Sequence, residues 1–374
     1  MAQIITEPQK AFSELDHFIN EKKIKNLFVV CGRSYESLGI SSNLQQIFDK
    51  NNVSLFYFRD FKPNPEYESV INGMREFNSK NCDGIISVGG GSAIDVAKCI
   101  KLFAKSGSNE DYLKQTIVPN SIPFIAVPTT AGTGSESTCF AVIYSKGEKK
   151  SIEDESCIPS FVILDPDTLT GLSDYQKRST LLDSLSHSIE SFWSIHSTEK
   201  SQQLSEEALR LILDNYETYL DVCDYNSRKN ILRASNIAGQ AINMTRTTAG
   251  HAMCYKLTTL YGISHGHAAA ICNTVLFPYM VQNIDKCIDP RGKEYLNNMF
   301  NDLAEVLGER NPKSAADRFA KLVDHIIQER PAADSDDIKL LTSSVNVLRL
   351  RNNPIELSAA VIEELYRKIL KTDI

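Results

Sequence analysis

Four side chains in the second half of the chain have the chemistry and spacing of metal ligands. Asp183 and His187 are four residues apart, so on a helix they project from the same face and can bind one cation. His251 and His265 are fourteen residues apart, about 21 Å on one unbroken helix, which is too far to share an ion. Gly262 predicts a break between them, so a turn can bring both imidazoles to one site. One carboxylate and three imidazoles suit Fe(II), Zn(II) or a similar divalent ion with a position open to substrate.

Two loops of small residues in the first half predict a phosphate site. Gly89, Gly90, Gly91 and Ser92 directly follow an apolar run and precede an amphipathic stretch. Glycine lets the backbone approach a phosphate, and the helix N-terminus offers free amides and the positive end of its dipole. The pattern is neither GxGxxG nor a P-loop, and a tight strand–helix turn without a ligand is the alternative. A second loop, 128–136, carries hydroxyl groups and glycines after the next apolar run, where ligands bind in open α/β sheets.

The hydrophobic pattern indicates which elements position these residues. Near-continuous apolar runs separated by amphipathic stretches predict a parallel sheet covered on both faces. The predicted strands are 27–30, 53–58, 84–88, 123–128 and 161–164. Beyond about residue 172 only helical patterns occur, at 175–196, 203–222, 228–258, 266–284, 295–307, 314–329 and 357–371, and 330–337 is predicted to be a surface loop. The chain is therefore predicted to have a Rossmann-like α/β domain (1–170) and an all-helical domain (171–374).

Composition narrows the functional class. The chain has 374 residues, of which 42% are hydrophobic, enough for a sizeable core. With 40 Lys and Arg against 47 Asp and Glu, the net charge of −7 disfavours a nucleic-acid or anionic-membrane surface. Nine cysteines without regular spacing do not indicate a disulfide framework. No signal peptide and no apolar run long enough to span a membrane are visible, so we expect a cytoplasmic protein with no membrane or nucleic-acid partner.

In their order along the chain, the motifs resemble those of the iron-containing (group III) alcohol dehydrogenases, which have a dehydroquinate-synthase-like fold. The matching segments are 62–65, 89–98, 128–136, 164–166, 183–190, 251–266 and 353–354. The resemblance implies a nicotinamide dinucleotide domain, a helical domain, an active site in the cleft between them and a homodimer. It also implies that Asp183, His187, His251 and His265 bind the metal. The residues that it implies along the cofactor are Asn64, Gly89, Gly90, Gly91, Ser92, Asp95, Thr129, Thr130 and Thr133.

This resemblance implies a reaction in which the metal, as a Lewis acid, stabilises the developing alkoxide while the nicotinamide transfers a hydride to the carbonyl carbon. Many family members carry a second histidine four residues after the one at position 251, where this chain has Tyr255. If that histidine relays a proton in relatives, Tyr255, His267 or water must do so here. For His267 the alternative is an ordinary loop histidine.

The cofactor preference is predicted from a second departure from the family pattern. NAD-preferring relatives often carry an aspartate after the first strand, which would bind the ribose hydroxyls and repel a 2′-phosphate. Here Gly32 leaves room, and Arg33 or Ser34 can contact the phosphate. We therefore expect NADP(H) to be preferred over NAD(H), with a solvated loop charge as the alternative role of Arg33.

The substrate is predicted from the charges around His251. Arg246 and Lys256 flank this residue together with threonine hydroxyls, which is a plausible oxyanion pocket. The stretch 245–258 resembles that of phosphonoacetaldehyde reductases within the family, which implies a small anionic aldehyde. The alternative is that both cations are surface charges or pair with acids such as Glu190.

Three other functions are weighed against this one. A reductase of neutral short-chain aldehydes or alcohols would use the same metal and cofactor. A dehydroquinate-synthase-like lyase shares the fold but needs a lysine-rich site, which 183–267 does not show. A non-catalytic binding protein is disfavoured by the intact set of four ligands.

Overall fold

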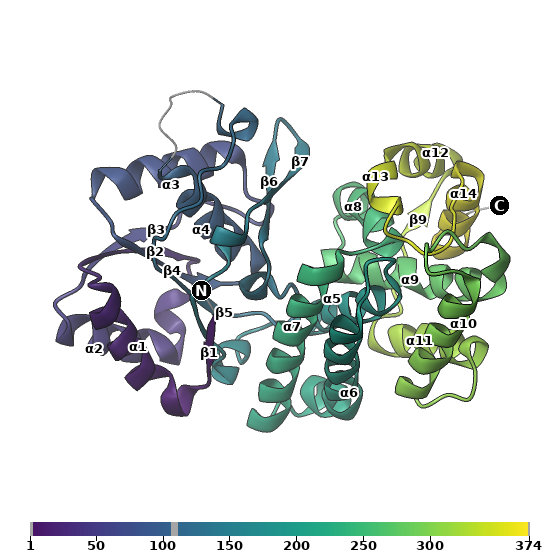
Figure 1. Ribbon diagram of the computed structural model, residues 1–374, viewed down its shortest axis with the longest axis horizontal. Helices are drawn as coiled ribbons and strands as arrows, with labels where there is room; N and C mark the ends of the chain where they lie inside the picture. The colour runs from purple at the N-terminus through teal and green to yellow at the C-terminus, as the bar shows by residue number, and fades with distance from the viewer. Residues whose placement is uncertain (1–2, 106–110, 373–374) are drawn as a thin grey trace. The chain divides into compact units, whose positions relative to one another are not determined.

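The structure is a computed structural model that describes residues 3–105 and 111–372, and its chain contacts define two units (Figure 1). The first comprises Met1–Leu172 and Cys223–Leu232, and the second comprises Ser173–Val222 and Arg233–Ile374. The first is α/β and the second is helical apart from one short strand pair, so the predicted fold class is confirmed.

A six-stranded sheet with the order β1-β8-β5-β4-β2-β3 lies at the centre of the first unit, and all of its neighbouring strands are parallel. The strands are β1 (Ile4–Thr6), β2 (Asn26–Cys31), β3 (Ser54–Phe58), β4 (Gly84–Gly89), β5 (Phe124–Pro128) and β8 (Phe161–Ile163). The five predicted strands are all present; four of them are almost entirely buried, as near-continuous apolar runs indicate, and β3 lies at the sheet edge with two exposed residues. Strand β1 was not predicted, since three residues at the sheet edge are too few to show a pattern.

Helices cover both faces of this sheet (Figure 1). On one face, α1 (Pro8–Lys22) and α2 (Gly39–Lys50) pack on residues such as Val29. On the other, α3 (Tyr67–Ser79) and α4 (Gly91–Phe103) pack on the next residues of the same strand, such as Phe28. This alternation follows from the two-residue repeat of a strand, in which successive side chains point to opposite faces of the sheet. Helix α4 begins two residues after the end of β4.

An antiparallel hairpin that the sequence did not predict follows the second loop. It consists of β6 (Phe140–Ser145) and β7 (Glu148–Glu153). Lys146 and Gly147 form its turn with φ values of 54° and 77°, which suits the twist of a two-residue hairpin. Charged β7 lacks the apolar run by which the other strands were found. Short 3-10 helices complete the unit: η1 (Tyr35–Ser37), η2 (Tyr112–Lys114), η3 (Ser135–Ser137), η4 (Glu155–Cys157) and η5 (Pro166–Leu169).

The second unit is built from helices. They are α5 (Asp174–Trp193), α6 (Glu199–Asp221), α8 (Ala249–Tyr261), α9 (His265–Gln282), η6 (Ile284–Lys286), α10 (Lys293–Val306), α11 (Pro312–Ile326), α12 (Ser335–Ser344), α13 (Val347–Leu350) and α14 (Ala359–Ile369). Helix α7 (Tyr225–Thr245) begins in the first unit and continues in the second. Strands β9 (Ala332–Ala333) and β10 (Lys371–Thr372) pair in parallel. Ser173 and Gln176 form a capping box that starts α5, the helix that carries Asp183 and His187.

Two predicted elements of the second unit were wrong in part. The single helix predicted at 228–258 is interrupted at Arg246, whose φ of 62° ends α7 before α8 begins. Side-chain contacts fix this break, because Thr245 Oγ1 lies 3.0 Å from Ser191 Oγ and the Thr248 amide donates to Glu190. The predicted loop 330–337 contains β9 and the first turn of α12, which Asp334 caps through two backbone amides.

The sequence predicted neither a disulfide framework nor a membrane-spanning segment. No disulfide joins any of the nine cysteines, all of which lie within 3–105 and 111–372. Of the helices described, none combines the length and the apolar character needed to cross a membrane.

Candidate metal centre and nucleotide loop

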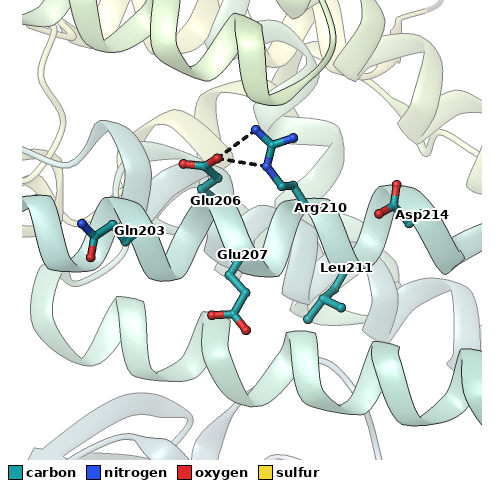
Figure 2. A pocket seen from close by; sticks show the side chains of 6 residues that line it. All are labelled: Gln203, Glu206, Glu207, Arg210, Leu211 and Asp214. Carbon is teal, nitrogen blue, oxygen red and sulfur yellow. Dashed lines mark hydrogen bonds and ion pairs between the residues drawn. The ribbon is translucent and has the colours of Figure 1, made fainter.

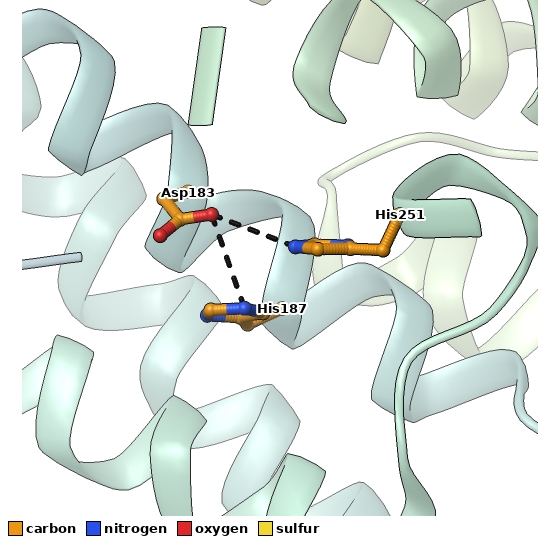
Figure 3. A group of neighbouring side chains, drawn as sticks. All are labelled: Asp183, His187 and His251. Carbon is orange, nitrogen blue, oxygen red and sulfur yellow. Dashed lines mark ion pairs between the residues drawn. The ribbon is translucent and has the colours of Figure 1, made fainter. Parts of the chain in front are cut away.

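Three of the four predicted ligands converge in the second unit (Figure 3). Asp183 and His187 lie one turn apart on α5, and His251 lies near the start of α8. Asp183 Oδ1 is 3.5 Å from His251 Nε2 and 3.9 Å from His187 Nε2. The two imidazole rings stack with their centroids 4.7 Å apart and their planes 13° from parallel. One ligand atom from each residue lies within 4.8 Å of the others, and all three side chains are buried.

The donor set fits a divalent metal ion. Asp183 Oδ1 and His251 Nε2 are both buried, and neither has a hydrogen-bond partner within the described residues. Buried polar atoms without a partner are costly, and a shared cation would remove this cost at both atoms. Carboxylate oxygen and imidazole nitrogen are ligands of Fe(II) and Zn(II).

His265 lies next to this group, at the start of α9. Gly262, with a φ of 69°, ends α8, so the predicted break is confirmed. The His265 ring centroid is 5.2 Å from that of His251, and its Nδ1 is 3.4 Å from Cys254 Sγ. His265 is not one of the three residues within 4.8 Å, so its role as fourth ligand stays a prediction.

Opposite charges stabilise one another in this centre. Burial raises the pKa of a carboxyl group, but the three imidazoles outweigh this effect and hold the pKa of Asp183 well below its ordinary value. Burial lowers the pKa of the His251 imidazole, but Glu190 and Asp183 outweigh it and raise this pKa to about 9. A bound cation would replace the positive charge that protonated His251 supplies.

Sequence reasoning missed the position of Glu190 beside this centre. Glu190 was considered only as a partner for Arg246 or Lys256, but its Oε1 accepts a hydrogen bond of 2.6 Å from His251 Nδ1. The sequence feature that could have indicated this position is the spacing of seven residues between Asp183 and Glu190, about two turns of a helix, which places both carboxylates on one face of α5.

The two proton-relay candidates have different surroundings. His267 Nδ1 lies 3.2 Å from the Tyr175 hydroxyl and its Nε2 lies 3.0 Å from the Glu329 carbonyl oxygen, so both ring nitrogens have protein neighbours. The Tyr255 ring stacks on that of His265, with centroids 5.5 Å apart and planes 12° from parallel. Tyr255 therefore contacts a predicted ligand directly.

The predicted substrate cations lie at either end of the stretch around His251. Arg246 is half-buried in the loop before α8, and Lys256 is half-buried on α8 itself. A third cation was missed: Arg349, on α13, donates a 2.6 Å hydrogen bond from Nη1 to the Tyr255 hydroxyl. Its position 93 residues beyond Lys256 gave no local signal.

In the first unit, the two predicted nucleotide loops pack against each other. Gly89 and Pro128, at the ends of β4 and β5, are register partners, and the Thr129 amide donates to the Gly89 carbonyl oxygen at 3.0 Å. A Cβ at Gly90 would lie 3.1 Å from Thr130 Oγ1, and one at Gly91 would lie 2.8 Å from Thr133 Cγ2. This packing requires small residues.

The same loop leaves the start of α4 suited to an anion. Gly90 is the N-cap residue and provides no side-chain acceptor, and Ser92 lies in the first turn. The backbone amides there can serve a phosphate.

Asp95 connects α4 to the hairpin. Its carboxylate accepts hydrogen bonds from Ser135 Oγ at 2.6 Å and from the Val142 amide at 2.9 Å. Burial raises the pKa of Asp95, and the neighbouring Lys98 opposes this rise. These contacts show Asp95 holding the loop after β5, and its predicted contact with the cofactor stays a prediction.

The remaining cofactor candidates follow β2 and β3. A Cβ at Gly32 would meet no atom within 4 Å, and the side chains of Arg33 and Asn64 are exposed. Beside them, Glu36 forms an ion pair with Arg59, whose guanidinium lies over the Tyr57 ring at 5.2 Å.

A parallel α/β unit with a glycine-rich loop, joined to a helical unit with a buried carboxylate–imidazole centre, defines a metal- and nucleotide-dependent class of enzyme. Residues 2–166 match the family model for iron-containing alcohol dehydrogenase, and 178–370 match the C-terminal model of the same family. The chain belongs to the iron-containing alcohol dehydrogenase family and is an oxidoreductase of that class.

Relatives and solved structures agree with this assignment. Alcohol dehydrogenase 4 of Schizosaccharomyces pombe is 31% identical over 80% of this chain and 70% of the relative. Phosphonoacetaldehyde reductase of Streptomyces viridochromogenes is 30% identical over 77% of this chain and 76% of the relative. The structure of sulfoacetaldehyde reductase from Bifidobacterium kashiwanohense with NAD+ is similar, with a TM-score of 0.85, 25% identity, and coverage of 99% and 98% of the two chains.

Proposed function

We propose that the protein reduces a small anionic aldehyde with NADPH at a divalent metal held by Asp183, His187, His251 and His265. In this proposal the first unit binds the nicotinamide cofactor and the second binds metal and substrate. The main support for a metal ion at this site comes from Asp183 Oδ1 and His251 Nε2. These two buried atoms face each other and have no hydrogen-bond partner among the described residues.

The residues around this centre suggest how the reduction proceeds. Asp183, His187, His251 and His265 would hold the ion, which would supply Lewis-acid chemistry, and a nicotinamide bound by the first unit would supply hydride-transfer chemistry. The Tyr255 ring stacks on that of His265, a proposed ligand, and its hydroxyl accepts a hydrogen bond from Arg349. Both nitrogens of His267 already have protein neighbours, and we therefore propose Tyr255 ahead of His267 as the proton relay.

The charge of the substrate is proposed from the cations near these residues. Arg246, Lys256 and Arg349 all lie on or beside the elements that carry His251 and Tyr255. By their names, two of the similar proteins act on anionic aldehydes, one a phosphonate and one a sulfonate.

A surface pocket on α6 provides a contrast (Figure 2). Its volume is about 400 Å³, and Arg210 is the one cation among its lining residues, which include Glu206, Glu207 and Asp214. Arg210 is also ion-paired with Glu206 at 2.8 Å. This pocket repels an anion, so Arg210 is a suitable control for the proposed substrate cations.

The test is initial-rate NADPH oxidation by Fe(II)-reconstituted protein with phosphonoacetaldehyde, sulfoacetaldehyde and propanal. We expect kcat/KM for one anionic aldehyde to exceed that for propanal, and Arg246→Ala or Lys256→Ala to lower it about tenfold to a hundredfold, as loss of a charge-assisted hydrogen bond does. Arg210→Ala should leave it unchanged. Equal rates with all three aldehydes would retain the reductase and reject the anionic substrate.

A neutral substrate is the second candidate. The similarity to alcohol dehydrogenase 4 supports it, and it predicts that propanal is the best substrate and that neither cation matters. The family match favours a dehydrogenase over the lyase alternative.

The cofactor preference is tested in the same assay. The open space at Gly32 and the exposed Arg33 support NADPH. We expect Arg33→Ala to raise KM for NADPH and leave KM for NADH unchanged. A variant that raises both equally, or neither, would contradict a contact with the 2′-phosphate. We also propose that the protein is a cytoplasmic homodimer, which sedimentation and cell fractionation would test.

A further inference from the structure

Glu190 is a fully buried carboxylate beside the three-residue group of Asp183, His187 and His251: it contacts Nδ1 of His251, whereas Nε2 of the same ring faces Asp183. Its exposed fraction is 0%, and it lies two turns after Asp183 on α5. Oε1 accepts hydrogen bonds from His251 Nδ1 at 2.6 Å and from Asn273 Nδ2 at 2.9 Å. Oε2 accepts from the Thr248 amide at 2.6 Å and from Thr248 Oγ1 at 2.8 Å.

These contacts determine which nitrogen of His251 carries a proton. An ionised carboxylate only accepts, so the His251 nitrogen that faces it, Nδ1, must donate. In neutral His251 the lone pair is then on Nε2, the atom that faces Asp183 Oδ1. A neutral imidazole with its lone pair on Nε2 is the form that binds a metal at that atom.

The surroundings allow Glu190 little freedom. The Trp193 indole donates to Thr248 Oγ1 at 2.9 Å, which leaves the Thr248 hydroxyl proton for Glu190. A Cβ at Gly250 would lie 2.6 Å from Glu190 Oε1 and 2.1 Å from Asn273 Oδ1, so the carboxylate occupies a space that only glycine at position 250 leaves open. The donors come from residues 58 to 83 positions away along the chain, so these hydrogen bonds depend on the tertiary fold and not on a local turn.

The charges also balance. Asp183 and Glu190 contribute two negative charges, and neutral imidazoles contribute none, so a divalent cation makes the buried centre neutral. Removal of the Glu190 charge would leave a net positive charge in a site from which water is largely excluded, and this is unfavourable.

We propose that Glu190 is a positioning residue that fixes the tautomer and orientation of His251 and thereby strengthens metal binding. The proposal rests on the metal centre proposed above. Glu190 is not one of the three residues whose ligand atoms lie within 4.8 Å of one another, and in this proposal it acts through His251.

The test is Zn²⁺ affinity, measured by competition with a chromophoric chelator, together with the visible spectrum of the Co²⁺-loaded protein. We expect E190Q to lower Zn²⁺ affinity about tenfold to a hundredfold and to change the Co²⁺ spectrum. Glu206→Gln, at a half-buried carboxylate on α6 that pairs with Arg210, is the control and should change neither.

A double-mutant cycle separates positioning from a general structural role. In an H251A background the same Glu190→Gln change should alter Zn²⁺ affinity less than about threefold, because its target is gone. An equal loss in both backgrounds would overturn the proposal. If E190Q does not fold, Thr248→Val removes one donor to the carboxylate, and several-fold weaker Zn²⁺ binding is expected, whereas unchanged binding would overturn the proposal. Wild-type protein that binds no Zn²⁺ or Co²⁺ would instead reject the metal centre itself.

Discussion

The nucleotide loop of the first unit and the metal centre of the second are built in opposite ways. At the loop, consecutive glycines bring backbone close to Thr130 and Thr133, and the groups offered to a ligand are backbone amides. At the metal centre the groups are charged or ionisable side chains, each buried. The loop is made by residues adjacent in sequence, whereas the centre needs contacts between α5, α8 and α9. We therefore expect substitutions at the centre to affect folding and chemistry together, and those at the loop to affect binding alone.

Buried charge also differs between the units. In the first unit, the Lys101 ammonium group donates to the Asn120 carbonyl and side-chain oxygens at 2.7 and 3.0 Å, but burial lowers its pKa to about 8. In the second, burial raises the pKa of Glu190, but His251, Asn273 and Thr248 outweigh it and lower this pKa to about 2. The surroundings of Glu190 therefore favour the charged form of its side chain, whereas those of Lys101 favour the neutral form.

Gly266→Ala is expected to have the largest effect on the second unit. A Cβ there would lie 2.1 Å from the Ser179 carbonyl oxygen and 2.7 Å from the Asp183 amide nitrogen, and backbone cannot rotate out of the way. Helix α9 must then move from α5, which we expect to cost about 3 kcal/mol of unfolding free energy and to abolish metal binding. Urea unfolding and Zn²⁺ titration would measure both. Gly171→Ala, where a Cβ meets no atom within 4 Å, is the control. Wild-type stability and Zn²⁺ binding in Gly266→Ala would show that the two helices tolerate separation.

A pH-dependent difference tests the contrast in buried charge. The folded pKa of Lys101, about 8, lies below its ordinary 10.5, so between these values the unfolded chain binds more protons and wild-type stability rises with pH. Below pH 8 the cost of the buried charge is present in full, and above 10.5 it is absent. Lys101→Met has no charge at this position, so its unfolding free energy should not show this rise with pH. Relative to wild type, it should therefore fall by on the order of 3 kcal/mol between pH 7.5 and 10.5. Denaturant titrations across that range measure the difference in unfolding free energy between Lys101→Met and wild type. If this difference does not change with pH, burial of the Lys101 charge does not destabilise the folded protein.

Gly91→Ala should have a smaller effect, confined to cofactor binding. The added Cβ meets Thr133 Cγ2 at 2.8 Å, a side chain on a loop that can shift. We expect KM for NADPH to rise about tenfold with little change in kcat, because in the proposed function this loop binds the cofactor phosphates and lies away from the reacting carbon. Steady-state kinetics would show this, with Gly39→Ala, where a Cβ has open space, as the control. A large fall in kcat at saturating NADPH would place the loop in the chemistry instead.

The same difference explains how much the sequence could predict. The β4–α4 turn and the pairing of Asp183 with His187 on one helix face could be predicted because each depends on a few consecutive residues, and Gly262 marked the turn before His265. Glu190 and Arg349 were not placed, because their partners lie 61 and 94 residues away. The end of α7 at Thr245 was missed because no glycine or proline marks it, and contacts with Ser191 and Glu190 impose it instead.

Metal removal and restoration test the central claim most directly. Protein treated with a strong chelator should lose NADPH oxidation with every aldehyde, and added Fe²⁺ or Zn²⁺ should restore it to wild type. Asp183→Asn should not recover, with activity lower by on the order of a thousandfold. Full turnover by chelated protein, shown to be metal-free by elemental analysis, would contradict the proposed centre.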